Sequence, residues 1–200
     1  MARPIDPERH ARKRDAILEA AASEFAAHGY AAATTAGICR AAGISSGTFF
    51  HYFPSKLDAL LGVLDAENAR ALARLAEIEG RSSGLSALLE YAEGFEREIS
   101  DDGYAGFVDG LLAVASTPEV AARLEAEASA AAGFLSRQVQ LAQEAGEIRG
   151  DIPARDLGTM VSWLLDGAAQ AAASAGPAAE ARRERPRIAE AVCGLLVTRA

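Results

Sequence analysis

The sequence predicts an all-α protein of about nine helices, and three observations support this prediction. Alanine alone supplies 47 of the 200 residues, whereas aromatic residues make up only 6% and β-branched residues are scarce. Such a composition favours helix over strand. Apolar residues recur at one-turn spacing along most of the chain, and no segment alternates polar and apolar residues over the length of a strand.

The first third of the chain is predicted to contain four helices separated by glycine or proline. The first ten residues are polar and are expected to form a loose arm, so the first helix starts near Ala11. The expected N-caps of the next three helices are Thr34 or Thr35, Ser45 or Ser46, and Ser55. The expected ends of the first three helices are Gly29, Gly43 and Pro54.

The rest of the chain shows only helical periodicity after the long fourth helix. The boundaries are short stretches rich in glycine, proline, serine and aspartate. The expected helices cover residues 84–100, 104–115, 118–145, 153–175 and 184–198.

The formal charge of −8 argues at first against an anionic partner such as DNA. However, the charge is unevenly placed, because residues 1–60 sum to +1 and residues 61–200 to −9. All three histidines also lie in the first part. The two parts are therefore expected to have different electrostatic tasks, with the acidic part facing away from any nucleic acid.

Several classes of protein are not supported by the sequence. The longest apolar run is far shorter than a membrane span, and the chain starts without the apolar core of a signal peptide. Cys39 and Cys193 belong to no Cys/His grouping, so neither a disulfide framework nor a metal site is expected. We therefore expect a cytoplasmic protein with no cofactor and no membrane partner.

Residues 34–50 have the pattern of a helix-turn-helix, in which two short helices are joined by a tight turn. Cys39 supplies the small residue that the helix crossing needs, and Gly43 supplies the positive φ that the turn needs. Ile38, Ile44 and Phe49 can bury the joint. The second helix of such a motif can lie in the major groove of DNA, which is about 12 Å wide.

The stretch from Arg14 to Leu61 resembles the DNA-binding domain of TetR-family transcriptional regulators. The residues that carry the resemblance are Ile17 to Ala21, Phe25 to Tyr30, Thr34, Ile38 and Ala42 to Lys56. The resemblance implies a homodimer, with residues 1–54 binding an operator and residues 55–200 binding an effector and dimerising. Three positions depart from the family pattern: Phe50 replaces a tyrosine whose hydroxyl often meets a phosphate, Cys39 replaces an alanine, and Gly37 interrupts a helix.

The DNA-contacting residues are expected on the two short helices and just after them. They are Thr34, Thr35, Ser45, Ser46, Gly47, Thr48, His51, Tyr52 and Lys56. Lys56 matches a backbone-contacting position of the family, although a solvated lysine is the alternative, and Thr34 could be a helix cap alone. Three phenylalanines, Phe49, Phe50 and Phe53, are expected to form a buried cluster. Cations near the start of the first helix would add salt-dependent affinity. They are Arg9, Arg12, Lys13 and Arg14.

The acidic part is expected to sense a small molecule and to dimerise. Candidate pocket residues are Phe95, Phe107, Leu111, Phe134, Met160 and Trp163, with Asp109 or Asp166 as polar partners. Candidate dimer residues are Leu157, Val161, Leu164, Leu165, Ala168, Ile188, Val192, Leu195 and Leu196. The resemblance suggests that the last two helices pair with those of a second copy. Ordinary core packing within one chain explains the same apolar stripe almost as well.

The sequence thus predicts a ligand-responsive repressor that binds a pseudo-palindromic operator as a homodimer. The alternatives are an activator of the same family, or a helical protein that binds a small molecule and has no operator. Residues 43–47 match the G-x-S-x-G pattern of hydrolases, but the preceding residues are helical and no acid–histidine pair follows in the required order. We therefore do not expect an enzyme.

Overall fold

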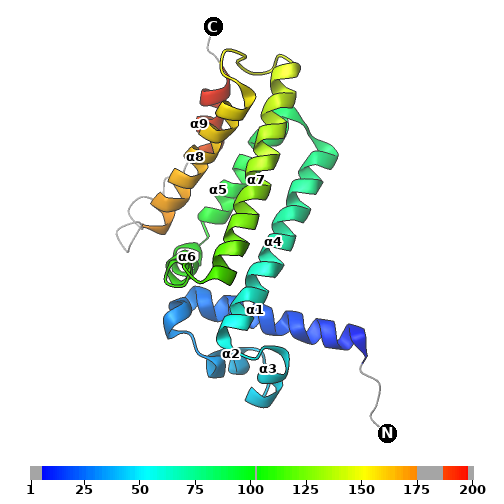
Figure 1. Ribbon diagram of the computed structural model, residues 1–200, viewed down its shortest axis with the longest axis vertical. Helices are drawn as coiled ribbons and strands as arrows, with labels where there is room; N and C mark the ends of the chain where they lie inside the picture. Colours follow the sequence, from blue (N-terminus) through cyan, green and yellow to red (C-terminus); the bar gives the residue numbers. More distant parts are fainter. Residues whose placement is uncertain (1–5, 102, 175–186, 198–200) are drawn as a thin grey trace. The chain divides into compact units, whose positions relative to one another are not determined.

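The computed structural model describes residues 6–101, 103–174 and 187–197. Within these ranges the chain forms nine α-helices and no β-strand, which confirms the predicted fold class (Figure 1). The helices are α1 (Pro7–Ala32), α2 (Thr35–Ala41), α3 (Ser46–Tyr52), α4 (Lys56–Arg81), α5 (Gly84–Ile99), α6 (Tyr104–Leu112), α7 (Pro118–Glu144), α8 (Ala154–Ala173) and α9 (Ile188–Leu196).

The chain packs as two compact units. One contains residues 1–67 and 106–123, and the other contains residues 68–105 and 124–200. These units reflect packing, whereas the predicted division at residue 54 is a functional one and stays a prediction. No helix in the described part of the chain is both long enough and apolar enough to span a membrane.

Local capping explains where α2, α3 and α4 begin. The hydroxyl groups of Thr34, Ser45 and Ser55 each accept the backbone N–H three residues further along, at 2.9, 3.2 and 3.1 Å. Gly29 (φ 68°) interrupts α1, and Gly43 (φ 63°) forms the turn after α2. These backbone angles strain any residue with a side chain. The predicted stop at Gly43 is confirmed, whereas Gly29 makes a kink after which α1 continues to Ala32.

The start of the first helix differs from the prediction. Helix α1 begins at Pro7, so residues 7–10 are helical and the expected loose arm is wrong for them. Asp6 caps the helix, because its carboxylate accepts the N–H groups of Glu8 and Arg9. Proline in the first turn costs no hydrogen bond there. Asp6 followed by Pro7 is therefore a helix-start signal in the sequence, and the prediction of a loose arm did not take it into account.

The later helices agree with their predicted ranges to within a few residues. Helix α6 is shorter than expected and ends at Leu112. The parts of the predicted helices that fall on residues 175–186 and 198–200 lie outside the described residues.

In the first unit, the apolar face of α1 packs on the three helices that follow it. The buried residues are Ile17, Leu18 and Phe25 from α1, Ile38 from α2, Phe49 from α3, and Leu60, Val63 and Leu64 from α4. Helix α6 also approaches α1 closely. A side chain at Gly106 would put its Cβ 2.6 Å from the Ala26 carbonyl oxygen, and one at Gly110 would lie 2.5 Å from the Tyr30 nitrogen. Glycine is therefore required at both positions.

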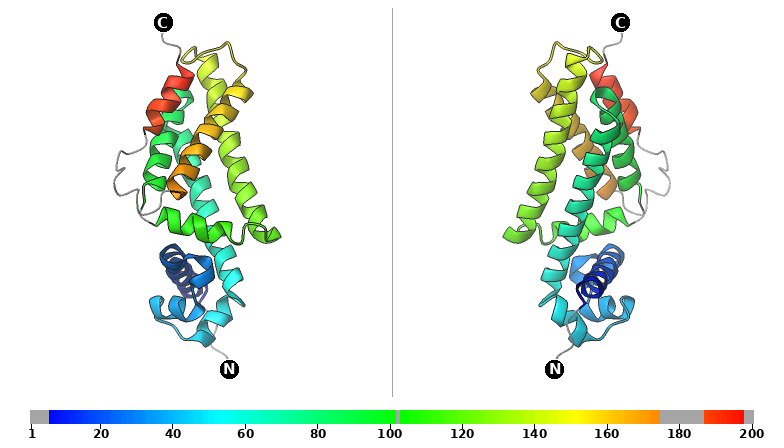
Figure 2. Two further views of the ribbon diagram at one scale, coloured as in Figure 1. Left: turned by 90° about the vertical axis from the view of Figure 1, so that its left-hand side faces the viewer. Right: turned by 90° about the vertical axis from the view of Figure 1, so that its right-hand side faces the viewer.

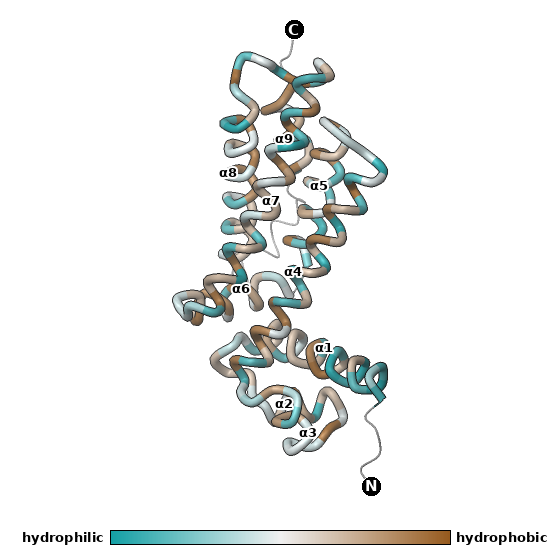
Figure 3. Tube along the Cα trace, turned by 45° about the vertical axis from the view of Figure 1, so that its right-hand side comes forward, coloured by the Kyte–Doolittle hydropathy of each residue, from teal (hydrophilic) through white to brown (hydrophobic). Residues whose placement is uncertain are grey.

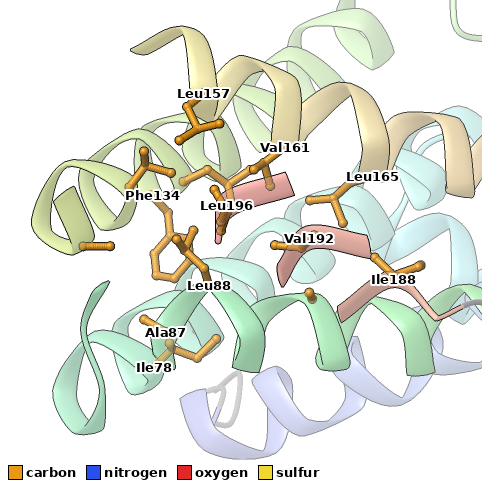
Figure 4. Close-up of a cluster of buried hydrophobic side chains, with 14 of the residues drawn as sticks. Ile78, Ala87, Leu88, Phe134, Leu157, Val161, Leu165, Ile188, Val192 and Leu196 are labelled. Carbon is orange, nitrogen blue, oxygen red and sulfur yellow. The ribbon is translucent and has the colours of Figure 1, made fainter. Parts of the chain in front are cut away.

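In the second unit, α9 lies against α5 and α8 (Figure 2). Side chains from α4, α5, α7, α8 and α9 point toward one another in one apolar core (Figure 4). Its members include Ile78, Leu88, Phe134, Leu157, Val161, Leu165, Ile188, Val192 and Leu196. The start of α5 is capped from elsewhere, because the buried Gln138 side chain accepts the Gly84 N–H at 3.0 Å and Glu147 accepts the Leu85 N–H at 2.9 Å.

Candidate nucleic-acid interface

Helices α2 and α3 form the predicted helix-turn-helix. Ile38 and Phe49 are fully buried, and the small Cys39 on α2 is buried as well. The Ile44 N–H donates to the Cys39 carbonyl at 3.0 Å across the turn that Gly43 makes. The turn therefore fixes the direction in which α3 leaves α2.

One face of α3 is open to solvent. Ser46, Gly47, Phe50 and His51 are exposed, at the i, i+1, i+4 and i+5 spacing of one helix face. We call these four residues the reading face. Two other predicted contacts of α3, Thr48 and Tyr52, are half-buried beside it. A short serine and a glycine at the start of this face leave room for a ligand to approach the backbone.

Phe50 belongs to this face, although it was predicted to be buried. Phe49 and Phe53 are buried as predicted, but the Phe50 side chain is 50% exposed. Consecutive residues on an α-helix lie about 100° apart, and α3 turns Phe49 to the core and Phe50 to solvent. Because consecutive residues can both be buried, as Ile17 and Leu18 are on α1, the sequence alone did not identify Phe50 as exposed. Its ring meets the Phe49 ring edge to face, with centroids 5.3 Å apart.

The residues predicted to contact DNA at the starts of α2 and α3 already make hydrogen bonds within the chain. The Thr34 hydroxyl accepts the Gly37 N–H, and the Ser45 hydroxyl lies 3.0 Å from the hydroxyl of Thr48. Thr34 and Ser45 are nevertheless exposed, and Thr35 is half-buried. Ser45 sits in a turn between two helices, not in the strand-to-helix turn that a hydrolase nucleophile occupies.

A carboxylate already lies at the start of α2, where the free N–H groups of a helix favour an anion. Glu24 accepts the Thr34 N–H at 3.4 Å, and its other oxygen lies 3.8 Å from the His28 imidazole. A side chain at Gly37 would overlap this carboxylate. Gly37, which departs from the family pattern, therefore makes room for Glu24.

Lys56 makes contacts within the chain that the sequence did not reveal. Its ammonium group donates to the carbonyl oxygens of Tyr30, Ala31 and Ala33 at 2.7, 3.3 and 2.9 Å. It also lies 4.4 Å from the centroid of the Tyr30 ring. Lys56 thus ties the start of α4 to the link between α1 and α2, and its phosphate contact stays a prediction.

The start of α1 brings further polar side chains to α3. The His10 ring packs on the Tyr52 ring with centroids 4.5 Å apart, and the His51 ring lies 6.2 Å away. The first turns of α1 are hydrophilic (Figure 3), and Arg9, Arg12 and Lys13 are exposed there. Arg14 instead lies over the buried Phe53 ring, at 5.4 Å. His10 was missed because its proximity to Tyr52 depends on how α1 crosses α3.

The six candidate pocket residues do not form one group in the structure. Phe107 and Leu111 are half-buried on α6 in the first unit. Phe134 is fully buried in the core of the second unit and Phe95 is half-buried beside that core. Met160 and Trp163 do not point into the chain, because they are 37% and 67% exposed on α8. The two polar candidates, Asp109 and Asp166, are exposed.

An aromatic group in the second unit joins α5 to α7. The Tyr91 ring lies 6.5 Å from the Phe95 ring and 5.3 Å from the Phe134 ring. Burial raises the pKa of Tyr91 to about 12, and the carboxylates of Glu98 and Glu127 contribute to the shift. The Tyr91 hydroxyl therefore stays neutral at an alkaline pH at which an exposed tyrosine would lose its proton.

Six of the nine residues predicted for the dimer interface are instead core residues of the chain itself. Leu157, Val161, Leu165, Ile188, Val192 and Leu196 are at most 4% exposed and pack on one another. They have almost no surface left to bury against a partner, so the alternative of intrachain packing holds for them. The other three are partly buried at the edge of the core: Leu164, Ala168 and Leu195.

Comparison with known proteins agrees with this geometry. Residues 17–62 match the family model described as "Bacterial regulatory proteins, tetR family". The chain is 30% identical to the HTH-type transcriptional regulator UidR of Escherichia coli K12 over 146 residues, which are 70% of each chain. It is 27% identical to the HTH-type transcriptional repressor AcnR of Corynebacterium diphtheriae, over 90% of this chain and 91% of AcnR.

Solved structures show the same fold. Salmonella enterica GusR has a TM-score of 0.68 and 27% identity, with 92% of this chain and 95% of GusR covered. A putative regulator from Saccharomonospora viridis, solved in complex with choline, has a TM-score of 0.80 and 21% identity, with 94% and 100% covered. The helix-turn-helix, the all-α fold and the identity to UidR together place the chain in the TetR family of bacterial regulatory proteins, as a DNA-binding transcriptional regulator.

Proposed function

We propose that this protein is a repressor that binds a pseudo-palindromic operator as a homodimer and releases it when a small molecule binds. The observation that carries the proposal is the exposed reading face of α3, held in place by the buried joint with α2. Relatives described as transcriptional repressors support repression over activation. Because an operator is chromosomal DNA, we place the working protein in the cytoplasm.

On the operator, α3 lies in the major groove with the reading face toward the base edges. The small Ser46 and Gly47 let the helix backbone come close to the bases. Contacts to phosphate fix the position of the helix-turn-helix on the DNA and carry little sequence information. We assign such contacts to Thr34, Thr35, Ser45, Thr48, Tyr52 and Lys56, with the exposed cations of α1 adding salt-dependent affinity.

The dimer surface is proposed on the outward face of α8, not on the buried stripe. This face exposes Met160, Trp163, Gly167 and Ala171. A Cβ on Gly167, or on Gly194 of α9, would meet no other atom within 4 Å, so packing within the chain does not require glycine at either position. An exposed tryptophan beside small residues suits a tightly packed interface, where tryptophan and methionine are enriched. A second copy would place two α3 helices about 34–36 Å apart, on successive major grooves.

The effector is proposed to be a small organic molecule that binds the DNA-free conformation more tightly than the DNA-bound one. Only such a ligand can shift the equilibrium away from the operator. The choline held by the S. viridis regulator shows that a protein of this fold can take one. The aromatic group of Tyr91, Phe95 and Phe134 is the part of the second unit that we assign to the sensing region.

Mapping of bound DNA across the host genome tests the proposal. We expect a few strong sites that contain an inverted repeat, and we expect deletion of the gene to raise transcription next to them. Lower transcription after deletion would make the protein an activator. The absence of any sequence-specific site would leave the alternative, a helical protein that binds a small molecule without an operator.

A further inference from the structure

Phe50 is a large apolar side chain that the fold leaves in solvent. Half of its surface is exposed, and its ring is held edge to face against the buried Phe49. It lies on the reading face between Ser46, Gly47 and His51, which are small or polar. An exposed ring that is fixed by its neighbour costs little further ordering when it packs against a partner.

The other side chains of α3 offer few ways to read bases. The helix contains no arginine or lysine, the residues that pair with guanine, and no asparagine or glutamine, the residues that pair with adenine. Its polar groups are hydroxyls and one imidazole. In the major groove, the 5-methyl group of thymine is the apolar feature that a base edge presents.

We propose that Phe50 is a specificity-determining residue that packs on the 5-methyl group of one thymine in each operator half-site. This inference rests on the proposed binding of α3 in the major groove. Phenylalanine has no hydroxyl with which to hold a phosphate, so its ring contributes through apolar contact. Ser46 and Gly47, one turn earlier on the same face, let the helix come close enough for the ring to reach a base edge.

The size of the effect follows from the burial of one methyl group. Such burial changes a binding constant by about fourfold. Because a dimer binds two half-sites, removal of both methyl groups is expected to weaken binding by about fifteenfold.

The experiment replaces thymine by deoxyuridine, which lacks only the methyl group. The purified protein first selects its operator from random-sequence duplexes. Each thymine pair related by the twofold symmetry of that operator is then replaced in turn, and binding is measured with wild type, Phe50→Ala, Phe50→Leu and His51→Ala. Binding of Phe50→Ala is measured at reduced salt, where the phosphate contacts retain it on DNA.

We expect one symmetric pair of thymines at which deoxyuridine weakens wild-type binding by about fifteenfold. The loss should vanish in Phe50→Ala, remain in His51→Ala, and remain in reduced form in Phe50→Leu, which is still apolar. Leu72→Ala, which removes an exposed apolar side chain from α4 outside the first unit, should bind like wild type.

Two results would overturn this inference and leave the proposed DNA binding by α3 intact. One is an operator whose affinity is insensitive to every replacement of thymine by deoxyuridine. The other is a loss of affinity on replacement that is equally large in wild type and in Phe50→Ala. In the second case the ring would contact only the sugar–phosphate backbone. If wild type selected no sequence at all, the proposed DNA-binding role of α3 would fail, and the inference with it. Thermal unfolding of Phe50→Ala and Phe50→Leu checks that both variants fold.

Discussion

The Lys56 ammonium group lies 2.7 Å from the carbonyl oxygen of Tyr30 and 4.4 Å from the centroid of the same residue's ring. Lys56 is also bonded to the carbonyls of Ala31 and Ala33, so one charged group orders the link between α1 and α2. We expect Lys56→Met to lower the free energy of unfolding by about 2 kcal/mol, the size of a hydrogen bond to a charged group. Urea unfolding at fixed protein concentration measures it.

Lys13→Met is the matched control, because Lys13 is exposed on α1. It should leave the free energy of unfolding unchanged. If Lys56 served only as a phosphate contact, Lys56→Met would also unfold like wild type. It would change only the salt dependence of DNA binding, lowering the slope of log K against log salt concentration by about one per contact. That result would contradict the structural role of Lys56.

Gly37 and Glu24 should be energetically coupled. In an ordinary helix, glycine to alanine adds about 1 kcal/mol of stability. Here a methyl group on residue 37 would displace the Glu24 carboxylate from the Thr34 N–H, so we expect Gly37→Ala to destabilise the protein by about 1 kcal/mol. In a Glu24→Ala background the same change should be stabilising.

The four proteins of this double-mutant cycle are compared by urea unfolding. A coupling of about 2 kcal/mol is expected from the two opposite effects of Gly37→Ala. If Gly37→Ala had the same effect with and without Glu24, the carboxylate would not be the reason for glycine at this position.

The raised pKa of Tyr91 predicts a loss of stability in alkali. Tyrosine ordinarily titrates near pH 10, whereas burial raises the pKa of Tyr91 to about 12 in the folded protein. Between these values the unfolded chain loses the proton first, so stability is complete below about pH 10 and falls as the pH rises. At pH 11 the loss from this group is about 1 kcal/mol.

Tyr91→Phe should remove this part of the alkaline loss. The quantity to compare is the drop in the free energy of unfolding from pH 8 to pH 11, in wild type and in the variant. Other groups that titrate in this range affect both proteins and cancel. Equal drops in the two proteins would show that the Tyr91 hydroxyl is not buried.

Trp163 and Gly167 should affect assembly and not the fold of one chain. Both are exposed on α8, and the added methyl of Gly167→Ala meets no atom of the chain. We expect Trp163→Ala and Gly167→Ala to weaken the dimer by at least tenfold, the first by removing a large contact and the second by separating the helices. Sedimentation across a range of concentrations gives the dimer dissociation constant.

Leu72→Ala is the control for loss of an exposed apolar residue elsewhere, and it should dimerise like wild type. Dimerisation unchanged by both α8 variants would place the interface on another surface.

The helix-turn-helix could be predicted because its signals are local. Thr34 and Ser45 cap helices within three residues of themselves, and Gly43 permits the turn by its own backbone angle. The contacts of Lys56 could not be predicted, because they join residues more than twenty positions apart. The contact of the His10 ring with the Tyr52 ring was hidden for the same reason, because these residues are also far apart in the sequence.

Helix α8 shows why the sequence could not separate a core face from a partner face. It carries apolar residues on two faces, with Leu157 and Val161 turned into the core and Met160 and Trp163 turned outward. Periodicity alone cannot say which apolar face meets the chain and which meets a partner. The more aliphatic stripe was predicted to meet the partner, whereas in the structure it forms the core.

The central claim is that the exposed face of α3 reads a particular DNA sequence. The most direct test measures the dissociation constants of the purified protein for its selected operator and for a scrambled duplex of the same length and composition, both at physiological salt. We expect a preference of about a thousandfold or more for the operator, as specific DNA-binding proteins show. Equal affinity for the two duplexes would contradict it.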